Sequence, residues 1–196
     1  MSKLIIATNN ADKVNEIRAI FGGFYDEILS LKDAGVCVDV AEDGQSFEEN
    51  AIKKATEAAK ITGCDTLADD SGLCVYALGG APGIFSARYS GECATDKDNN
   101  EKLLKELAGI KDRGAKFVCS VALVTGGEVL TACGSVDGTI TESERGQGGF
   151  GYDPLFYVSA LGQTFGELPA EIKNSLSHRS RALQLLKLKL IERRQL

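Results

Sequence analysis

Apolar residues along this chain form short continuous runs and helical stripes, and the two patterns alternate. Residues 4–7 are a continuous apolar run, which is typical of a strand buried on both faces. Residues 11–21 repeat their apolar positions every three or four places, which predicts a helix. Asn10 is a good N-cap for this helix, and Gly22 would end it. A strand, a polar turn and a helix therefore open the chain.

The rest of the chain continues this alternation. Ser46 and Glu49 have the spacing of a capping box, which predicts the start of a long helix. Gly126 and Gly127 separate two strand-like runs and predict a hairpin, so the sheet should be mixed rather than wholly parallel. The expected strands cover residues 27–31, 66–68, 73–78, 116–125 and 128–138, and the expected helices cover 47–62, 96–108 and a last segment that ends near 194.

Composition narrows the class of protein. With 196 residues, 43% of them hydrophobic and 26% charged, the chain is long enough for one domain, or for one domain with two lobes. A net charge of −6 argues against a broad face that binds nucleic acid. Six cysteines without a C-x-x-C pair and a single histidine argue against zinc. We find no signal-peptide core and no apolar run that approaches a membrane span, so we expect a cytoplasmic protein that does not bind membranes.

Two adjacent carboxylates, Asp69 and Asp70, follow a short apolar run and precede Ser71 and Gly72. We expect the strand to end here and Gly72 to let the chain turn. Because neighbouring strand positions point to opposite faces, one aspartate should face a ligand while the other braces it or faces away. Carboxylates beside a hydroxyl suit Mg²⁺, which usually also meets phosphate oxygens. The alternative is a polar turn in which an aspartate caps the backbone.

The polar turn after the first strand is a candidate phosphate site. Thr8, Asn9, Asn10 and Lys13 gather at the start of a helix, where backbone N–H groups can bind an anion. The P-loop string is absent, and a capped helix with a solvated lysine is an equally good interpretation of this segment. Lys53 lies on the helix that follows an acidic loop and offers a second positive charge, unless it too is solvated.

A glycine-rich stretch at residues 146–156 would let the backbone approach a ligand closely. Phe150 and Tyr152 offer flat faces on which a base could stack, and Asp153 precedes a proline and should be extended. The alternative is a hairpin loop whose aromatic rings lie in the core. His178, the only histidine, opens the last helix beside Arg179.

Six motifs occur in one order along nearly the whole chain. They are A-T-N-N-x-x-K (7–13), the segment 42–55, A-D-D-S-G-L (68–73), G-G-A-P-G-x-x-S-A-R-Y (79–89), G-G-F-G-Y-D-P (148–154) and S-H-R (177–179). Each motif is weak alone, but together they resemble the inosine triphosphate pyrophosphatase family, the enzymes that remove non-standard purine nucleoside triphosphates. One departure is Asn9, at a position where glycine is frequent in that family.

The resemblance implies an α/β protein with a long mixed central sheet flanked by helices. Residues 1–196 would form a single domain of two lobes with the active-site cleft between them, and the protein would work as a homodimer. The implied reaction is hydrolysis of ITP, dITP and XTP between the α and β phosphates, which gives the monophosphate and pyrophosphate. The implied cofactor is Mg²⁺, for which Mn²⁺ could substitute.

The family match and the chemistry of the side chains assign the same roles. Asp70 would be the base that activates water, with Asp69 orienting the site, although the two could exchange roles. Glu42 and Asp70 would hold the metal. The phosphates would be bound by Thr8, Asn9, Asn10, Lys13, Lys53 and Ser71, and the purine by Phe150, Gly151, Tyr152, Asp153, Lys173, His178 and Arg179.

Base specificity would come from donors aimed at purine O6. Arg179 is the expected donor, because a guanidinium rewards an acceptor and penalises the amino group of adenine.

Two other interpretations remain open. The Maf-type nucleotide pyrophosphatases share the general architecture but act on other bases, and the S-H-R and F-G-Y-D motifs argue for the purine branch. A nucleotide sensor without activity would keep Lys13 and the purine-binding residues but would not need a metal-bound base. The presence of Glu42, Asp69 and Asp70 argues against a sensor.

Overall fold

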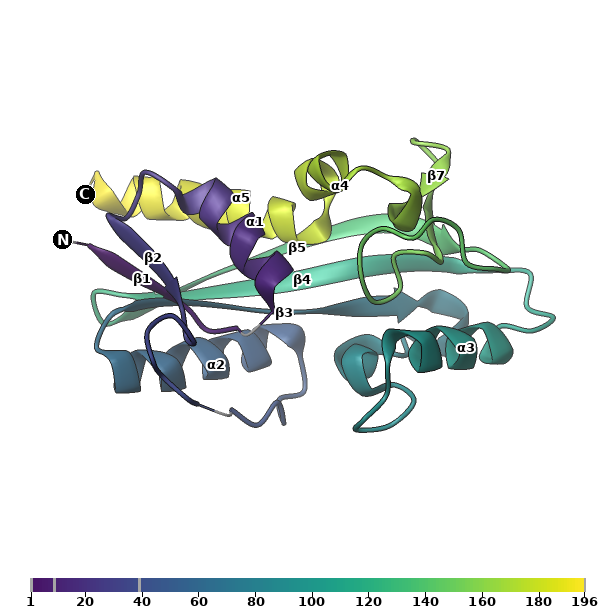
Figure 1. The fold of residues 1–196 in the computed structure, drawn as a ribbon, viewed down its shortest axis with the longest axis horizontal. Helices are drawn as coiled ribbons and strands as arrows, with labels where there is room; N and C mark the ends of the chain where they lie inside the picture. Colours follow the sequence, from purple (N-terminus) through teal and green to yellow (C-terminus); the bar gives the residue numbers. More distant parts are fainter. Residues whose placement is uncertain (1, 9, 39, 196) are drawn as a thin grey trace. The chain divides into compact units, whose positions relative to one another are not determined.

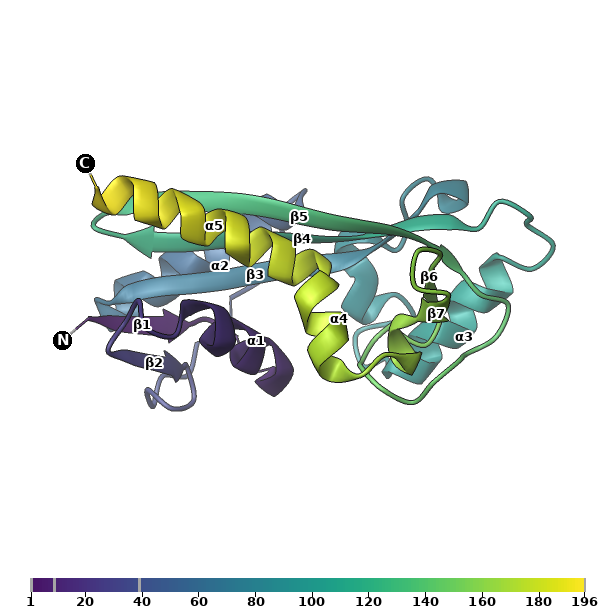
Figure 2. The ribbon, with the colours of Figure 1, turned by 90° about the horizontal axis from the view of Figure 1, so that it is seen from above.

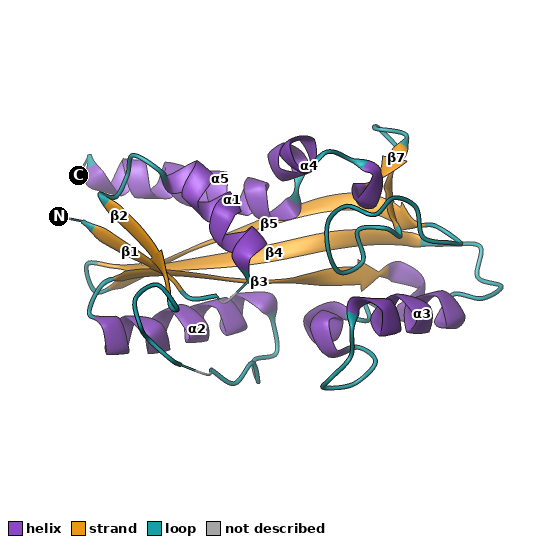
Figure 3. Cartoon of the chain, in the orientation of Figure 1, coloured by secondary structure: helices purple, strands orange, loops and turns teal. Residues whose placement is uncertain are grey.

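The computed structural model describes residues 2–8, 10–38 and 40–195. Within these residues seven strands form one sheet in the order β2-β1-β3-β4-β5-β6-β7 (Figure 3). The strands are β1 (Lys3–Ile6), β2 (Glu27–Ser30), β3 (Asp65–Val75), β4 (Gly114–Thr125), β5 (Glu128–Ile140), β6 (Phe156–Val158) and β7 (Gln163–Thr164). The helices are α1 (Ala11–Phe21), α2 (Phe47–Thr62), α3 (Asp96–Glu106), α4 (Ala170–Leu176) and α5 (His178–Arg194).

The pairing of the strands confirms the predicted α/β class and the mixed sheet. β1 runs parallel to both β2 and β3, with Leu4 opposite Ile28 on one side and Asp65 on the other. β6 pairs antiparallel with β5 and with β7. Gly126 and Gly127, which join β4 to β5, have φ values of 55° and 81°, as a tight hairpin turn requires.

The helix ends follow the local sequence closely. Asn10 caps α1 by accepting from the amides of Asp12 and Lys13, as predicted. Ser46 caps α2 by accepting from the Glu49 amide, but the Glu49 carboxylate accepts from Gln45 rather than from Ser46. The expected capping box is therefore closed one residue earlier than in its usual form.

The predicted turn at residues 69–72 is wrong, because β3 continues without a break through both aspartates and Gly72. Gly72 lies in the strand and is not one of the glycines with positive φ. The strand continues because Leu73 and Val75 are fully buried and add to the same sheet. Beyond Val75 the expected strand is replaced by a short 3-10 turn, η1 (Tyr76–Leu78). The helix α4 was not predicted.

The chain divides into two compact units. Unit 1 consists of Met1–Asp70, Cys119–Gly134 and His178–Leu196, and unit 2 consists of Ser71–Val118 and Ser135–Ser177. The long strands β3, β4 and β5 each contribute residues to both units. Among the described residues, no helix is both long and apolar enough to cross a membrane.

Unit 1 has helices on both faces of its strands. α1 and α5 pack on each other over one face, and α2 covers the opposite face (Figures 1 and 2). The strand residues alternate between the two sides: Leu4 and Leu67 belong to the core under α1 and α5, and Ile5 and Ala68 to the core under α2. The continuous apolar run of β1 therefore does indicate burial on both faces.

Unit 2 has one hydrophobic core. It contains Leu73 and Val75 from β3, Leu103 from α3 and the ring of Tyr152 from the glycine-rich loop. α3 packs against the 3-10 segment η2 (Gly83–Arg88). The glycine-rich loop is thus anchored in the unit through one of its own aromatic rings.

Candidate active site

The alternation of β3 sends its two aspartates to opposite faces of the sheet. Leu67 and Asp69 share the face covered by α1 and α5, and Ala68 and Asp70 share the face covered by α2. Both carboxylates are buried, with residue exposures of 1% for Asp69 and 6% for Asp70. The prediction that the two aspartates point apart is correct, although the strand does not end there.

Asp69 is fixed by cations from both helices on its face. Its Oδ2 lies 2.9 Å from Lys13 Nζ of α1 and accepts from Arg179 Nε of α5 at 3.1 Å. Arg179 is 1% exposed, and its Nη1 also donates to Glu16 Oε2 at 3.1 Å. Burial alone would raise the pKa of Asp69, but Lys13, Arg179 and Lys54 together hold the pKa below its usual value. The two cations on this face therefore favour the ionised form of Asp69 and hold its Oδ2.

Asp70 has a different environment, formed by α2. The amide of Asn50 donates to Asp70 Oδ2 at 2.9 Å, and Lys54 Nζ lies 3.6 Å from Oδ1. Burial raises the pKa of Asp70, with a further contribution from Glu42, although Lys54 and the Asn50 amide oppose this shift. A buried carboxylate with a raised pKa is well suited to accept a proton.

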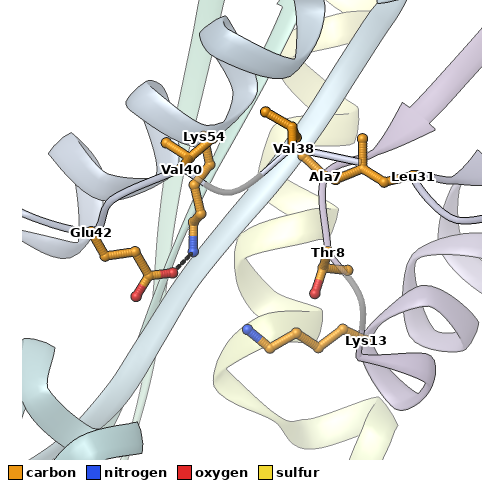
Figure 4. Close-up of a pocket in the computed structure, with 8 residues that line it drawn as sticks. All are labelled: Ala7, Thr8, Lys13, Leu31, Val38, Val40, Glu42 and Lys54. Carbon is orange, nitrogen blue, oxygen red and sulfur yellow. Dashed lines mark hydrogen bonds and ion pairs between the residues drawn. The ribbon is translucent and has the colours of Figure 1, made fainter. Parts of the chain in front are cut away.

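A pocket of about 200 Å³ opens in unit 1 at the start of α1 (Figure 4). Lys13 of α1 and Lys54 of α2 bring two ammonium groups to it, and the hydroxyl of Thr8 lies near Lys13. Glu42 Oε1 accepts from Lys54 at 2.7 Å. The residues that line the pocket are Ala7, Thr8, Lys13, Leu31, Val38, Val40, Glu42 and Lys54. Two cations and a hydroxyl in one pocket suit an anion with several charges, such as a polyphosphate.

The backbone at the start of α1 contributes less to this pocket than the sequence predicted. The amides of Asp12 and Lys13 already donate to Asn10 Oδ1, at 2.9 and 3.1 Å, and the Asn10 amide donates to Thr8 Oγ1 at 3.2 Å. These amides are therefore satisfied within the chain, and the Lys13 side chain supplies the positive charge instead. Asn9, also a predicted phosphate ligand, lies outside the described residues.

The carboxylates near Lys54 fit a hard divalent cation. Glu42 and Asp70 both reach the same ammonium group, at 2.7 and 3.6 Å, so one positive charge can be shared between them. Within the described residues, no group of three or more His, Cys, Asp or Glu side chains could hold a metal. Mg²⁺ usually combines one or two carboxylates of the protein with water and phosphate oxygens.

Unit 2 brings together a second set of predicted residues. Lys173 Nζ lies 2.5 Å from Asp153 Oδ2 in a buried ion pair, and 4.4 Å from the centre of the Phe150 ring. The Phe150 amide donates to the same carboxylate oxygen at 2.8 Å. Gly149 has a φ of 75°, and a Cβ there would lie 2.1 Å from Asp153 Oδ2, so only glycine fits.

Other predicted site residues are placed differently. The Tyr152 ring is 4% exposed in the core of unit 2, with its hydroxyl donating to the Ser86 carbonyl at 2.8 Å, so it is not open for stacking. Ser71 follows Asp70 in β3 and is half-buried. His178 is buried at the first position of α5, and it lies in unit 1 with Arg179, whereas Lys173 lies in unit 2.

A model of the Ham1 family matches residues 4–189 of this chain. The chain belongs to the Ham1 family. A dITP/XTP pyrophosphatase of Geobacter sulfurreducens is 55% identical over 190 residues, which cover 95% of this chain and 96% of the relative. A dITP/XTP pyrophosphatase of Clostridium perfringens is 50% identical over 196 residues, with coverage of 95% and 96%. The Ham1 protein of Staphylococcus aureus has a similar structure, with a TM-score of 0.89 at 42% identity over 98% of this chain and 100% of that one. The resemblance to pyrophosphatases of non-standard purine nucleotides is confirmed.

In this Ham1 chain the structure points to three polar residues that the sequence reasoning missed. Lys54 lines the pocket, whereas Lys53 pairs with Asp43 at 2.6 Å. Asn50 and Lys54 are four positions apart on α2, so they share the face that meets Asp70, and this spacing could have identified both. Glu16, the second carboxylate on Arg179, carries no local signal beyond its place on the buried side of α1.

Proposed function

We propose that this chain hydrolyses the non-canonical purine triphosphates ITP, dITP and XTP to the nucleoside monophosphate and pyrophosphate. One observation carries the proposal: the pocket of unit 1 gathers Lys13, Lys54 and Glu42, with Asp70 in contact with Lys54. Membership of the Ham1 family supports the choice of substrate, because the relatives are named dITP/XTP pyrophosphatases.

In this proposal the phosphates bind through side chains of unit 1. Lys13 and Lys54 neutralise charge on the phosphate oxygens, and Thr8 donates a hydrogen bond. Preorganised cations of this kind make the main protein contribution to phosphoryl transfer. Asn10 and Ser71 are further proposed donors to the phosphates. Lys53 is left out of the proposed phosphate site, because its side chain pairs with Asp43 at 2.6 Å.

Asp70 is the proposed general base. Its Oδ2 accepts from the Asn50 amide and its Oδ1 faces Lys54 Nζ at 3.6 Å, and this carboxylate takes the proton from the attacking water. The water oxygen bonds to the α-phosphorus, the bond from that phosphorus to the bridging oxygen breaks, and pyrophosphate leaves. Asp69 does not take this proton, because Lys13 and Arg179 stabilise its ionised form.

Glu42 and Asp70 would hold the divalent cation, for which we propose Mg²⁺ with Mn²⁺ as a substitute. A carboxylate has enough lone pairs for a cation and for a proton acceptor role together. The bound cation supplies charge neutralisation of the phosphate oxygens.

Residues of unit 2 form the proposed base site. Phe150 stacks on the purine, while Lys173 and Asp153 meet its polar edge. Lys173 is a pure donor and so favours the O6 acceptor of a 6-oxo purine over the amino group of adenine. Gly151 and Tyr152 contribute through the loop backbone. His178 and Arg179 remain purine ligands by resemblance, and Arg179 has the additional task of orienting Asp69.

Three further statements follow from the resemblance and stay predictions. Residues 1–196 would act as one enzymatic domain, two copies would form a homodimer, and the protein would work in the cytoplasm. Light scattering on the purified protein measures the mass of the assembly directly.

The proposed function is tested by pyrophosphate release. With Mg²⁺ present, the protein should release pyrophosphate from ITP, dITP and XTP, and far less from ATP. Chelation should abolish release, and Mg²⁺ or Mn²⁺ should restore it, because the proposed ligands are carboxylate oxygens rather than thiolates. Orthophosphate as the first product, or full activity after chelation, would refute the proposal.

The same assay compares two adjacent lysines. Lys54→Met should lower kcat/KM for ITP by about 10²-fold, because it removes a cation from the phosphate pocket. Lys53→Met is the matched control and should change kcat/KM by less than about 3-fold, since the side chain is paired at the surface with Asp43. Equal losses in the two variants would show that the pocket does not hold the phosphates.

A further inference from the structure

Within unit 2, side chains of α3 form hydrogen bonds to the backbone of Gly151 in the glycine-rich loop. Asp96 and Asn100 lie four positions apart on α3 and so share a face of the helix. The Gly151 amide donates to Asp96 Oδ2 at 2.6 Å, and Asn100 Nδ2 donates to the Gly151 carbonyl at 3.2 Å. Both backbone polar groups of Gly151 are therefore bonded to side chains of α3.

The backbone conformation of Gly151 influences where the side chains of Phe150 and Tyr152 lie. Its φ is 61°, so the chain reverses here, between the Phe150 ring on one side and the buried Tyr152 on the other. The same Asn100 amide also donates to Glu144 Oε1 at 2.9 Å, which ties the start of the loop to the same helix. Asn100 is 3% exposed, and both bonds of its amide are part-buried.

We propose that Asp96 and Asn100 are positioning residues for purine binding. They fix the peptide groups of Gly151 and thereby set the direction of the Phe150 ring, on which the base would stack. This inference rests on the proposed function, because it assigns the loop to the base. Neither side chain needs to touch the nucleotide.

The expected signature is a loss of base binding without a loss of chemistry. Unit 1 contains the proposed catalytic and phosphate-binding groups, Asp70, Lys13 and Lys54. The hydrogen bonds to Gly151 are formed within unit 2. Loosening the loop should therefore raise KM for a nucleotide and leave kcat nearly unchanged. A ligand without a base should bind as before.

Asn99 provides a matched control on the same helix. It is also 3% exposed, but its partners lie in the segment that precedes α3. Its Nδ2 donates to the Ala87 carbonyl at 3.1 Å, and its Oδ1 accepts from the Ser90 amide at 2.8 Å. Asn99→Leu and Asn100→Leu thus remove the same polar group at the same depth. Only the second change releases the glycine-rich loop.

The experiment measures KM and kcat for ITP, and the inhibition constant of inorganic tripolyphosphate, in wild type, Asn100→Leu and Asn99→Leu. Leaving the half-buried Gly151 carbonyl without its Asn100 donor should raise KM about 10-fold in Asn100→Leu, with kcat within about 2-fold and tripolyphosphate inhibition unchanged. Asn99→Leu should leave the KM for ITP near that of wild type. An equal KM rise in both variants, or a parallel weakening of tripolyphosphate, would overturn the proposal.

Asp96→Ala keeps the test decisive if Asn100→Leu does not fold. Asp96 is exposed, so its removal spares the core, and it should raise KM for ITP in the same way by freeing the Gly151 amide. An unchanged KM in Asp96→Ala would then overturn the proposal. If the wild-type protein hydrolyses ITP but the variants do not behave as expected, only the positioning role is refuted. If the wild-type protein does not bind ITP, the proposed function is refuted as well.

Discussion

Asp70→Asn is expected to lower kcat for ITP hydrolysis by about 10²–10⁴-fold, which is the usual contribution of a general base. The substitution keeps the shape of the side chain and removes the oxygen charge that would take the proton of water. The Asn50 amide can still bond to the carbonyl oxygen of the new residue, so the strand should keep its place. Steady-state kinetics on ITP should therefore show a large fall in kcat with a small change in KM.

Asp69→Asn is the comparison that separates the two carboxylates. Because Asp69 accepts from Lys13 and Arg179, its loss should chiefly disturb the buried charges and lower stability. A turnover of Asp70→Asn close to that of wild type would contradict the assignment of the base. If Asp69→Asn then lost turnover while its unfolding midpoint was unchanged, Asp69 would be the base.

Arg179→Met is expected to lower the free energy of unfolding by about 3–5 kcal/mol, because it leaves two buried carboxylates without their shared cation. The side chains of Asp69 and Glu16 are 0% and 4% exposed, so water cannot replace the guanidinium without opening the core. Lys13 still faces Asp69, which places the effect toward the lower end of that range. Urea denaturation monitored by circular dichroism measures the change.

Arg181→Met is the control for this variant. Arg181 lies two positions away on the same helix and is exposed, so water can replace its partners and its replacement should change stability by less than about 1 kcal/mol. If Arg179 also binds the purine, as we propose, a second effect should appear, a larger loss of kcat/KM for ITP than for ATP. Equal losses for the two substrates would leave Arg179 with the orienting role alone.

Local signals in the sequence predicted the elements of unit 1 well. The cap at Asn10, the end of α2 at Gly63 and the hairpin at Gly126 all depend on residues close together in the chain, so a pattern of a few positions specifies them. The two faces of β3 were predicted for the same reason, since alternation is a property of any strand.

The errors occurred where distant residues decide the outcome. Gly72 stays in a strand because Leu73 and Val75 pack into a core that later segments of the chain form. A local sequence pattern contains no information about that packing. Arg179 bonds Asp69 across 110 positions of sequence, so the S-H-R motif alone does not predict its contact with β3. Lys54, rather than Lys53, lies four positions from Asn50 on the same face of α2, and this spacing is a local signal in the sequence.

The attack of water on the α-phosphorus is the central claim of this account, and isotope labelling tests it most directly. Wild-type protein should hydrolyse ITP in water enriched in ¹⁸O, and mass spectrometry should then locate the label in the products. The account predicts the label in inosine monophosphate and unlabelled pyrophosphate. Label in pyrophosphate, or products that consist of inosine diphosphate and orthophosphate, would contradict it.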